Sequence, residues 1–186
     1  MGRTREEIIK IRNQDDANIA EWIDQNVDGN SIGDLGCGWG VMISELKERG
    51  WEVWGLDLNS KRIKIVPKNI KDNVWIGDLI TTKNLKKSDV ALTIEVAEHL
   101  SIDTEDLFIK QLMKLDADTI VMTVATTGQE AKSHFNIKPR RMWIDKIEKK
   151  GYNENEALEY KFKKDLEGRL KIKAWISWNI MIFNKK

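Results

Sequence analysis

Four side chains in the middle of the chain are of types that can activate a hydroxyl group. Glu95, Glu98 and His99 form a Glu-x-x-Glu-His run, and His134 follows in a later polar stretch. A positioned imidazole or carboxylate can remove a proton from a hydroxyl. Two carboxylates and two imidazoles can also hold Mg²⁺, Mn²⁺ or Zn²⁺, which would lower the pKa of a bound hydroxyl. The alternative is that these side chains only shape the wall of a pocket.

A second group of residues has the composition of a ligand-binding turn. It is an acid followed by three alternating glycines: Asp34, Gly36, Cys37, Gly38, Trp39 and Gly40. Glycine lets a ligand lie against the main chain, where the amides at the start of a helix offer donors. A nicotinamide dinucleotide fingerprint would need its third glycine at position 41, which is Val41. The turn predicts a different ligand, or a tight strand-to-helix connection with a structural role alone.

These residues need a sheet to bring them together, and the hydrophobic pattern predicts one. The predicted strands are the start of 31–40, then 52–58, 73–79, 88–96 and 119–124. Helices are expected between them. Two of the strands end in an acid followed by leucine, at Asp57-Leu58 and Asp78-Leu79. The carboxyl ends of parallel strands lie at one edge of a sheet, so these acids should meet the glycine turn there.

The two ends of the chain are predicted to depart from this repeat. Thr4 to Glu7 has the pattern of a capping box, which predicts a helical hairpin or one kinked helix over residues 5–26. In residues 158–163, and again in 172–182, apolar and polar residues alternate. This period of two predicts a closing antiparallel hairpin.

The order of these elements and their strand-end motifs resembles the class I S-adenosylmethionine-dependent methyltransferases, from about residue 28 onward. The resemblance implies an α/β, Rossmann-like fold with a seven-stranded, mostly parallel sheet, a C-terminal antiparallel hairpin and helices on both faces. It also implies S-adenosylmethionine as the cofactor. Asp34 would then lie near the methionine amino group, Asp57 would bind the ribose hydroxyls, and Asp78 with Leu79 would contact adenine. The cofactor-binding residues implied in this way are Asp34, Gly36, Cys37, Gly38, Trp39, Gly40, Asp57, Leu58, Asp78, Leu79 and Glu95.

The run at 95–99 resembles two methyltransferase families, the small-RNA 2′-O-methyltransferases and the catechol O-methyltransferases of ubiquinone synthesis. In the former, four such side chains bind a divalent cation that holds the two hydroxyls of a terminal ribose. This resemblance implies that Glu95, Glu98, His99 and His134 are catalytic residues and metal ligands. A similar run also occurs in methyltransferases that use no metal, where the first acid lies near the cofactor. Both interpretations stay open at this stage.

Composition bears on the methyl acceptor. The net charge is +1; the first 60 residues are acidic overall and residues 139–186 basic, with no continuous basic stripe for a nucleic-acid backbone. A small hydroxylated acceptor, such as a sugar, a nucleotide or a phenolic metabolite, is the first hypothesis. A metal-dependent RNA 2′-O-methyltransferase, which would act on an RNA end, is the second. A cofactor-binding module without turnover is the third.

The length of 186 residues predicts one domain, with residues 1–27 as a helical cap and 28–186 as the catalytic core. Cys37 is the single cysteine, which excludes an internal disulfide and fits a reducing compartment. No apolar run is long enough to span a membrane, so we expect no membrane partner and a cytoplasmic location.

Overall fold

The computed structural model describes residues 4–186, and in them seven strands form one mixed sheet in the order β3-β2-β1-β4-β5-β7-β6. The strands are β1 (Ser31–Leu35), β2 (Glu52–Asp57), β3 (Val74–Ile76), β4 (Val90–Ile94), β5 (Thr119–Thr123), β6 (Tyr152–Glu154) and β7 (Ile180–Lys185). Strands β1 to β5 pair in parallel, whereas β7 is antiparallel to both β5 and β6. The predicted α/β fold with an antiparallel C-terminal strand pair is confirmed.

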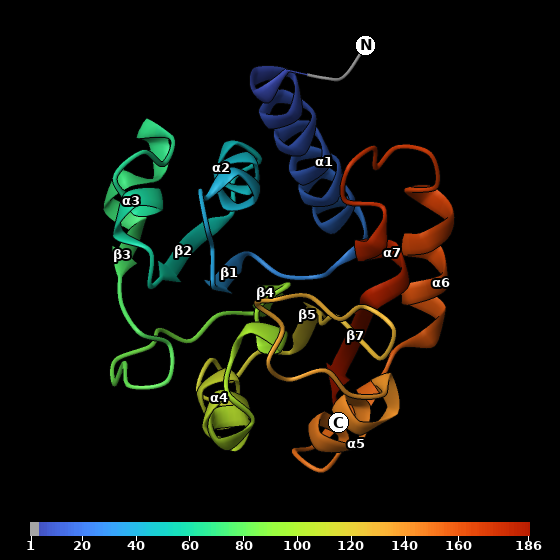
Figure 1. Cartoon of the computed structure of the whole chain (residues 1–186). Helices are drawn as coiled ribbons and strands as arrows, with labels where there is room; N and C mark the ends of the chain where they lie inside the picture. Colours follow the sequence, from blue (N-terminus) through green and yellow to red (C-terminus); the bar gives the residue numbers. More distant parts are fainter. Residues whose placement is uncertain (1–3) are drawn as a thin grey trace.

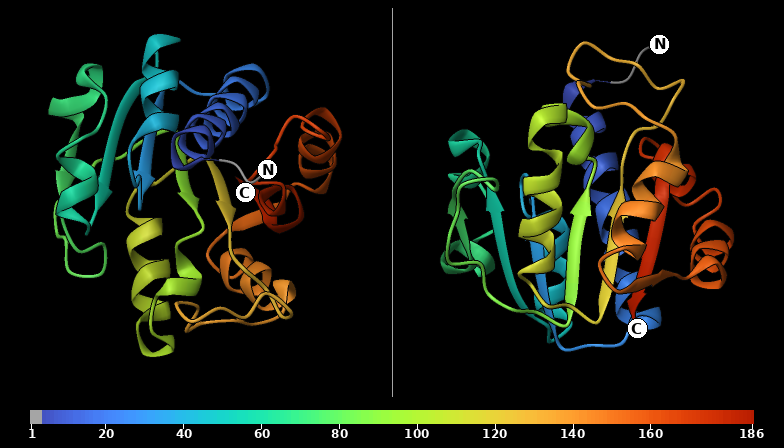
Figure 2. Two further views of the ribbon diagram at one scale, coloured as in Figure 1. Left: turned by 45° about the horizontal axis from the view of Figure 1, so that its top comes forward. Right: turned by 90° about the horizontal axis from the view of Figure 1, so that it is seen from below.

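Helices cover both faces of this sheet (Figures 1 and 2). The α-helices are α1 (Arg5–Asn26), α2 (Val41–Glu48), α3 (Ser60–Ile63), α4 (Glu105–Met113), α5 (Arg140–Glu148), α6 (Glu156–Asp165) and α7 (Trp175–Asn179). Short 3₁₀ turns are η1 (Lys68–Asn73), η2 (Ala97–His99) and η3 (Ile102–Thr104). In Figure 1, α1, α2 and α3 lie on one side of the sheet, and α4 and α5 lie on the other.

The core is divided by the sheet into two hydrophobic clusters. In β5, Val121 belongs to one cluster, while its neighbours Ile120 and Met122 belong to the other. This follows from the alternation of side chains across a strand, and it explains why the central strands are apolar along their whole length. The sheet therefore holds its strand ends rigidly, and the candidate site lies at those ends.

The N-terminal helix begins with the predicted capping box. The amide of Glu7 donates to Thr4 Oγ1 at 3.2 Å, and the amide of Thr4 donates to Glu7 Oε2 at 2.7 Å. The predicted helical hairpin is wrong, because residues 5–26 form one continuous helix of 22 residues. Its polar run at 13–16 does not interrupt it, since Asp15 is fully buried and bonded to a distant segment.

The expected strand at 158–163 is instead part of helix α6. Asn155 caps that helix, with its side chain accepting from the amide of Leu158 at 2.9 Å. Leu158 and Phe162 are four residues apart and face the core cluster together, whereas Tyr160 is 69% exposed. The strand predicted from alternating apolar and polar residues at 158–163 is therefore wrong, because residues four apart also lie on one face of a helix.

The second half of the expected hairpin is only partly a strand. Residues 170–174 have no regular structure, α7 follows, and β7 begins at Ile180. The antiparallel partner of β7 at the sheet edge is β6, which comes before α6 in the chain. The hairpin thus exists as a strand pair, but two helices lie between its strands.

Within residues 4–186, no helix combines the length with the apolar character that crossing a lipid bilayer requires.

Candidate active site

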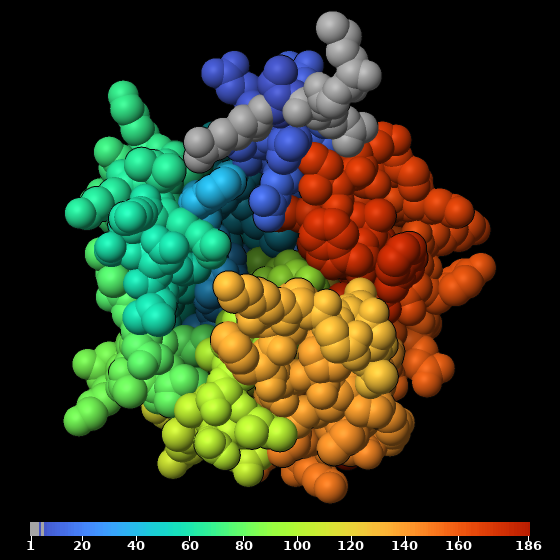
Figure 3. Space-filling view, viewed as in Figure 1, coloured from blue at the N-terminus to red at the C-terminus, as the bar shows by residue number. Residues whose placement is uncertain are grey.

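A cavity of about 960 Å³ lies where β1, β2 and β4 end. Figure 3 shows the viewed face hollowed at its centre, between the blue and teal N-terminal segments, the red C-terminal segment and the yellow-orange loop. All of the cofactor-binding residues predicted from the sequence line this cavity: Asp34, Gly36, Cys37, Gly38, Trp39, Gly40, Asp57, Leu58, Asp78, Leu79 and Glu95. His99 and His134 line it too. The strand ends therefore converge as the parallel sheet requires.

Two glycines of the turn after β1 have different reasons to be glycine. Gly36 has φ +93°, and a Cβ there would lie 2.4 Å from Val96 Cγ2, so packing excludes a side chain. Gly38 has φ +58°, and a Cβ there would meet no described atom within 4 Å. Because Gly38 lines the cavity, the space beside it is open to a ligand. Gly38 thus leaves main chain exposed where a ligand can lie against it.

Asp57 holds this turn from the end of the neighbouring strand. Its Oδ2 accepts from the amide of Gly38 at 2.9 Å, and its Oδ1 accepts from the amide of Asn59 at 2.7 Å. Each carboxylate oxygen has a second lone pair, so both can still accept from a ligand hydroxyl. Arg62 lies 3.9 Å from Oδ2. This geometry suits two adjacent hydroxyls such as those of a ribose.

Asp34 is a buried acid on the central strand of the sheet. It lies between Gly55 of β2 and Leu92 of β4 in the strand register. Burial, and then the nearby charge of Asp57, raise the pKa of Asp34 to about 8. A buried carboxyl group that opens on a cavity favours a cationic ligand group, which would restore its charged form. The primary amine of an amino acid is such a group.

The cavity therefore fits the cofactor that the sequence predicts. Asp34 can meet an ammonium group, Asp57 can accept from two hydroxyls, and Gly38 leaves main chain open between them. The apolar side chain of Leu79 and the carboxylate of Asp78 also line the cavity, and a heterocycle with an amino group needs such an apolar surface and an acceptor.

At the opposite edge, two histidines are held by backbone carbonyls. His99 Nδ1 lies 2.8 Å from the carbonyl oxygen of Ser133, and His134 Nδ1 lies 2.7 Å from that of Gln129. A carbonyl only accepts, so Nδ1 carries the proton in both rings. In the neutral ring this leaves the Nε2 lone pair available. Each histidine can therefore act as a base or as a metal ligand through Nε2.

Glu98 lies directly behind the histidines. It is fully buried: its Oε1 accepts from the amide of Ala125 at 3.3 Å, while its Oε2 has no hydrogen-bond partner among residues 4–186. Burial, and then the charge of Glu95, raise the pKa of Glu98 to about 7. One ligand atom from each of Glu98, His99 and His134 lies within 4.8 Å of the others. An unpartnered buried oxygen beside two imidazoles fits a cation.

Glu95, the fourth predicted ligand, is not part of this group of three. It takes φ +55°, a conformation that is rare for a residue with a side chain and that often marks a functional site. Its Oε1 accepts from Asn179 Nδ2 at 3.3 Å. The structure therefore places the ligand atoms of Glu98, His99 and His134 together, while Glu95 lies beside Glu98 in the cavity lining but outside that group.

The loop that carries His134, residues 124–139 between β5 and α5, is fixed by buried polar contacts. Asn136 Nδ2 donates to Glu105 Oε2 at 2.9 Å, and Lys138 forms an ion pair with the same oxygen. The amides of Phe135 and Asn136 donate to the carbonyl oxygen of Glu98. Glu105, Asn136 and Lys138 are all buried. The position of His134 is thereby tied to α4 and to the end of β4.

The side chains that form one wall of the cavity were not among the predicted site residues, although residues 1–27 were expected to form a helical cap. This wall comes from α1 and from the segment before and within α7: Arg12, Asp16, Lys173, Trp175 and Ile176. Arg12 lies 6.0 Å above the ring of Trp39, and Lys173 forms an ion pair with Asp16. The polar run at 13–16 is the local signal for Asp16, but by its pattern alone it predicts a break in the helix. Its partners lie about 150 residues away, beyond any local pattern.

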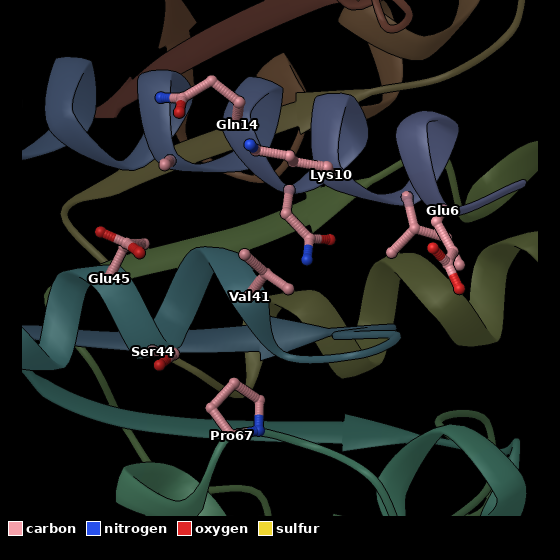
Figure 4. Close-up of a pocket in the computed structure, with 10 residues that line it drawn as sticks. Glu6, Lys10, Gln14, Val41, Ser44, Glu45 and Pro67 are labelled. Atoms are coloured by element: carbon pink, nitrogen blue, oxygen red, sulfur yellow. The ribbon is translucent and has the colours of Figure 1, made fainter. Parts of the chain in front are cut away.

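A second, more open cavity of about 670 Å³ lies between α1 and α2 (Figure 4). Its lining includes Lys10 and Gln14 from α1 with Ser44 and Glu45 from α2. None of the site residues predicted from the sequence lines it. Of the two cavities, only the larger one is lined by site residues predicted from the sequence.

Comparison with known proteins identifies the family. The sequence profile of the methyltransferase domain family matches residues 8–160. The ubiquinone biosynthesis O-methyltransferase of Pelagibacter ubique is 32% identical over 106 residues, covering 54% of this chain and 43% of that protein. A second such enzyme, from Leptothrix cholodnii, is 26% identical over 90 residues, which cover 42% of this chain and 38% of that protein. The chain thus matches less than half the length of these curated relatives.

Solved structures agree on the fold. The magnesium protoporphyrin IX methyltransferase from Synechocystis, solved with bound S-adenosylmethionine, superposes with a TM-score of 0.68 at 17% identity, over 100% of this chain and 86% of that chain. The methyltransferase domain of bacterial CtHen1-C gives a TM-score of 0.63 at 19% identity, over 94% of this chain and 98% of that chain. The family profile covers most of the chain. The seven-stranded sheet of the chain has the class I methyltransferase topology. The chain therefore belongs to the methyltransferase domain family and has the fold of the class I S-adenosylmethionine-dependent methyltransferases.

Proposed function

We propose that the 960 Å³ cavity binds S-adenosylmethionine and that the enzyme methylates a hydroxyl group of a small acceptor. The observation that carries this proposal is the pair of histidines on the cavity wall, each with Nδ1 tied to a carbonyl and Nε2 free. Methylation of an oxygen needs an acceptor for the hydroxyl proton, whereas a thiolate or a neutral amine needs less help. The names of the two curated relatives, both O-methyltransferases, support the same choice.

The chemistry divides between cofactor and protein. When bound, S-adenosylmethionine supplies a methyl carbon on a sulfonium, which an oxygen attacks in line while the thioether leaves. Nε2 of His99 or His134 takes the acceptor proton, and its tautomer is already set by the carbonyl that holds Nδ1. Asp34 would hold the amino group of the cofactor and Asp57 its ribose, so the remaining task of the protein is to hold the acceptor in line with the methyl group.

A metal-dependent reaction is the second candidate, and the buried oxygen of Glu98 favours it. Glu98, His99 and His134 would hold the cation, which would orient the acceptor oxygen and lower its pKa. A cation with open positions can hold two neighbouring hydroxyls, so this candidate extends the acceptors to the ribose at an RNA end. Glu95 is left out of this ligand set.

One screen separates these candidates. Cofactor with a labelled methyl group is incubated with pooled small hydroxylated compounds and, separately, with short RNAs, each with and without EDTA. Labelling of a small compound that survives EDTA supports the histidine-base reaction, and labelling that EDTA abolishes and Mg²⁺, Mn²⁺ or Zn²⁺ restores supports the metal. Transfer confined to amines or thiols would contradict both.

Replacing His134 by Ala is expected to lower turnover by roughly 10²–10⁴-fold while leaving cofactor affinity within about twofold, because proton removal is lost but the cofactor contacts remain. The measurement pairs the turnover number with calorimetric titration of S-adenosylhomocysteine. Phe135→Ala is the matched control, since Phe135 is adjacent, 66% exposed and outside the cavity lining. Equal loss in both variants would contradict a chemical role for His134.

Replacing Asp57 by Ala is expected to weaken S-adenosylhomocysteine binding by roughly 1–3 kcal/mol, because two charge-assisted acceptors for ribose hydroxyls are removed. The change also removes the bond that holds Gly38. Asp57→Asn keeps one acceptor oxygen and should bind with intermediate affinity. Calorimetry that shows all three proteins binding equally would remove Asp57 from the ribose site.

A further inference from the structure

We infer that Asp15 is a positioning residue that holds one wall of the cofactor cavity closed. This inference rests on the proposed location of the cofactor in the 960 Å³ cavity. Asp15 does not itself line that cavity, although its neighbour Asp16 does. Asp15 acts through the segment of residues 170–174, here called the strap, which leads from α6 to α7.

The contact is a buried carboxylate that receives three successive amides of the strap. Asp15 Oδ1 accepts from the amide of Lys171 at 2.9 Å, and Asp15 Oδ2 accepts from the amides of Ile172 and Lys173, both at 2.8 Å. Asp15 is fully buried in the middle of α1. Hydrogen bonds from amides to an ionised carboxylate are stronger than those between neutral groups, so this one side chain fixes the strap closely.

The strap depends on Asp15 because it has no regular structure of its own. Residues 170–174 pair with no strand, and backbone amides that lie inside a protein need an acceptor. Asp15 supplies that acceptor for three amides in a row. The buried side chains of Leu170 and Ile176 anchor the segment on either side. Loss of Asp15 would therefore release the middle of the strap without detaching its ends.

The strap and α1 together form the wall that faces the glycine turn. From α1 come Arg12, one turn before Asp15, and Asp16, its neighbour; from the strap comes Lys173. The ion pair between Asp16 and Lys173 joins the two pieces at the cavity surface. Releasing the amide of Lys173 would let this pair separate and the wall move outward.

The test is Asp15→Asn, which keeps the size of the side chain but places an NH₂ group against amide donors. Calorimetry with S-adenosylhomocysteine should show affinity lower by about tenfold or more, because the strap must then be ordered at the expense of binding. Hydrogen exchange should show residues 171–173 losing protection in the variant, while the core strands keep theirs. In the wild-type protein, S-adenosylhomocysteine should increase the protection of the strap.

Asp24→Asn is the matched control, because it makes the same chemical change on the same helix. Asp24 Oδ1 accepts from Trp51 Nε1 at 2.8 Å, away from both cavities. It should lower thermal stability and leave affinity within about twofold. An Asp15→Asn protein that is less stable but binds equally well would overturn the inference, and so would a wild-type strap whose protection is unchanged by ligand. A wild-type protein that does not bind S-adenosylhomocysteine would overturn the proposed function, and the inference with it.

Discussion

A Gly38→Val variant is expected to lose measurable binding of S-adenosylhomocysteine while keeping its sheet. The new side chain would project into open cavity space, since a Cβ at this position meets no described atom within 4 Å. The amide that donates to Asp57 is retained, so the turn keeps its main hydrogen bond. At φ +58° a branched side chain costs about 1–2 kcal/mol, which a folded domain tolerates. We expect affinity to fall by at least about 100-fold, or roughly 3 kcal/mol.

Calorimetry measures the loss of binding, and far-ultraviolet circular dichroism with thermal unfolding measures the fold. Gly50→Val is the matched control: Gly50 also has positive φ, +98°, also faces open space and lines neither cavity. Gly50→Val should lower the free energy of unfolding at least as much as Gly38→Val does, and it should leave the affinity for S-adenosylhomocysteine unchanged. A Gly38→Val protein that binds within about fivefold of the wild type would show that the ligand does not lie against this turn.

An Asp34→Asn variant is expected to be more stable than the wild type and to bind the cofactor more weakly. The two effects have one cause, the burial that raises the pKa of Asp34 to about 8. Asparagine is neutral, so it avoids the cost of a buried charge, but it cannot balance the ammonium group of the cofactor. We expect affinity for S-adenosylhomocysteine to fall by roughly 10–100-fold, in the range for loss of a charged hydrogen-bond partner.

The stability difference should depend on pH in a defined direction. An unfolded aspartate releases its proton near pH 4, whereas folded Asp34 keeps it until about pH 8. The stability that Asp34 contributes is therefore complete below pH 4 and is lost as the pH rises towards 8. Asparagine does not titrate, so the Tm of the variant minus that of the wild type should grow between pH 5 and pH 8.

Thermal unfolding of both proteins across this range is the measurement. Asp78→Asn serves as the control, because it changes an exposed carboxylate on the same cavity. It should give a Tm difference that stays constant between pH 5 and pH 8. A constant difference for Asp34→Asn as well would mean that Asp34 is already charged in the folded protein.

The convergence of the proposed cofactor residues on one cavity could be predicted because these residues are close in sequence to the strand ends that place them. Asp34, Asp57 and Asp78 each stand at or just beyond the end of a short apolar strand, and a parallel sheet brings such ends together. Their convergence depends on the strand order and not on contacts between distant side chains. The histidine side was predicted less completely, because sequence spacing does not show that Glu95, at a positive φ, falls outside the group formed by Glu98, His99 and His134.

The C-terminal third could not be predicted in detail because its apolar spacing is compatible with two structures. Leu158 and Phe162 fit both a strand of period two and a helix of period near four, and the Asn155 cap decides for the helix. The Asp15 contacts were beyond reach for another reason. An acid in a helix is usually solvated, and only the folded structure shows that three amides near residue 172 surround this one.

The buried ion pair between Glu105 and Lys138 has a consequence for how the enzyme can move. Such pairs add little net stability, because the desolvation of both charges offsets their attraction. Separating Lys138 from Glu105, however, would leave one buried charge without a partner of opposite sign. The loop that carries His134 is therefore held to α4 by the contacts of Asn136 and Lys138 with Glu105. It behaves as an extension of the rigid sheet edge and not as a gate. In the proposed reaction, the histidine base on this loop would then keep one position through every turnover.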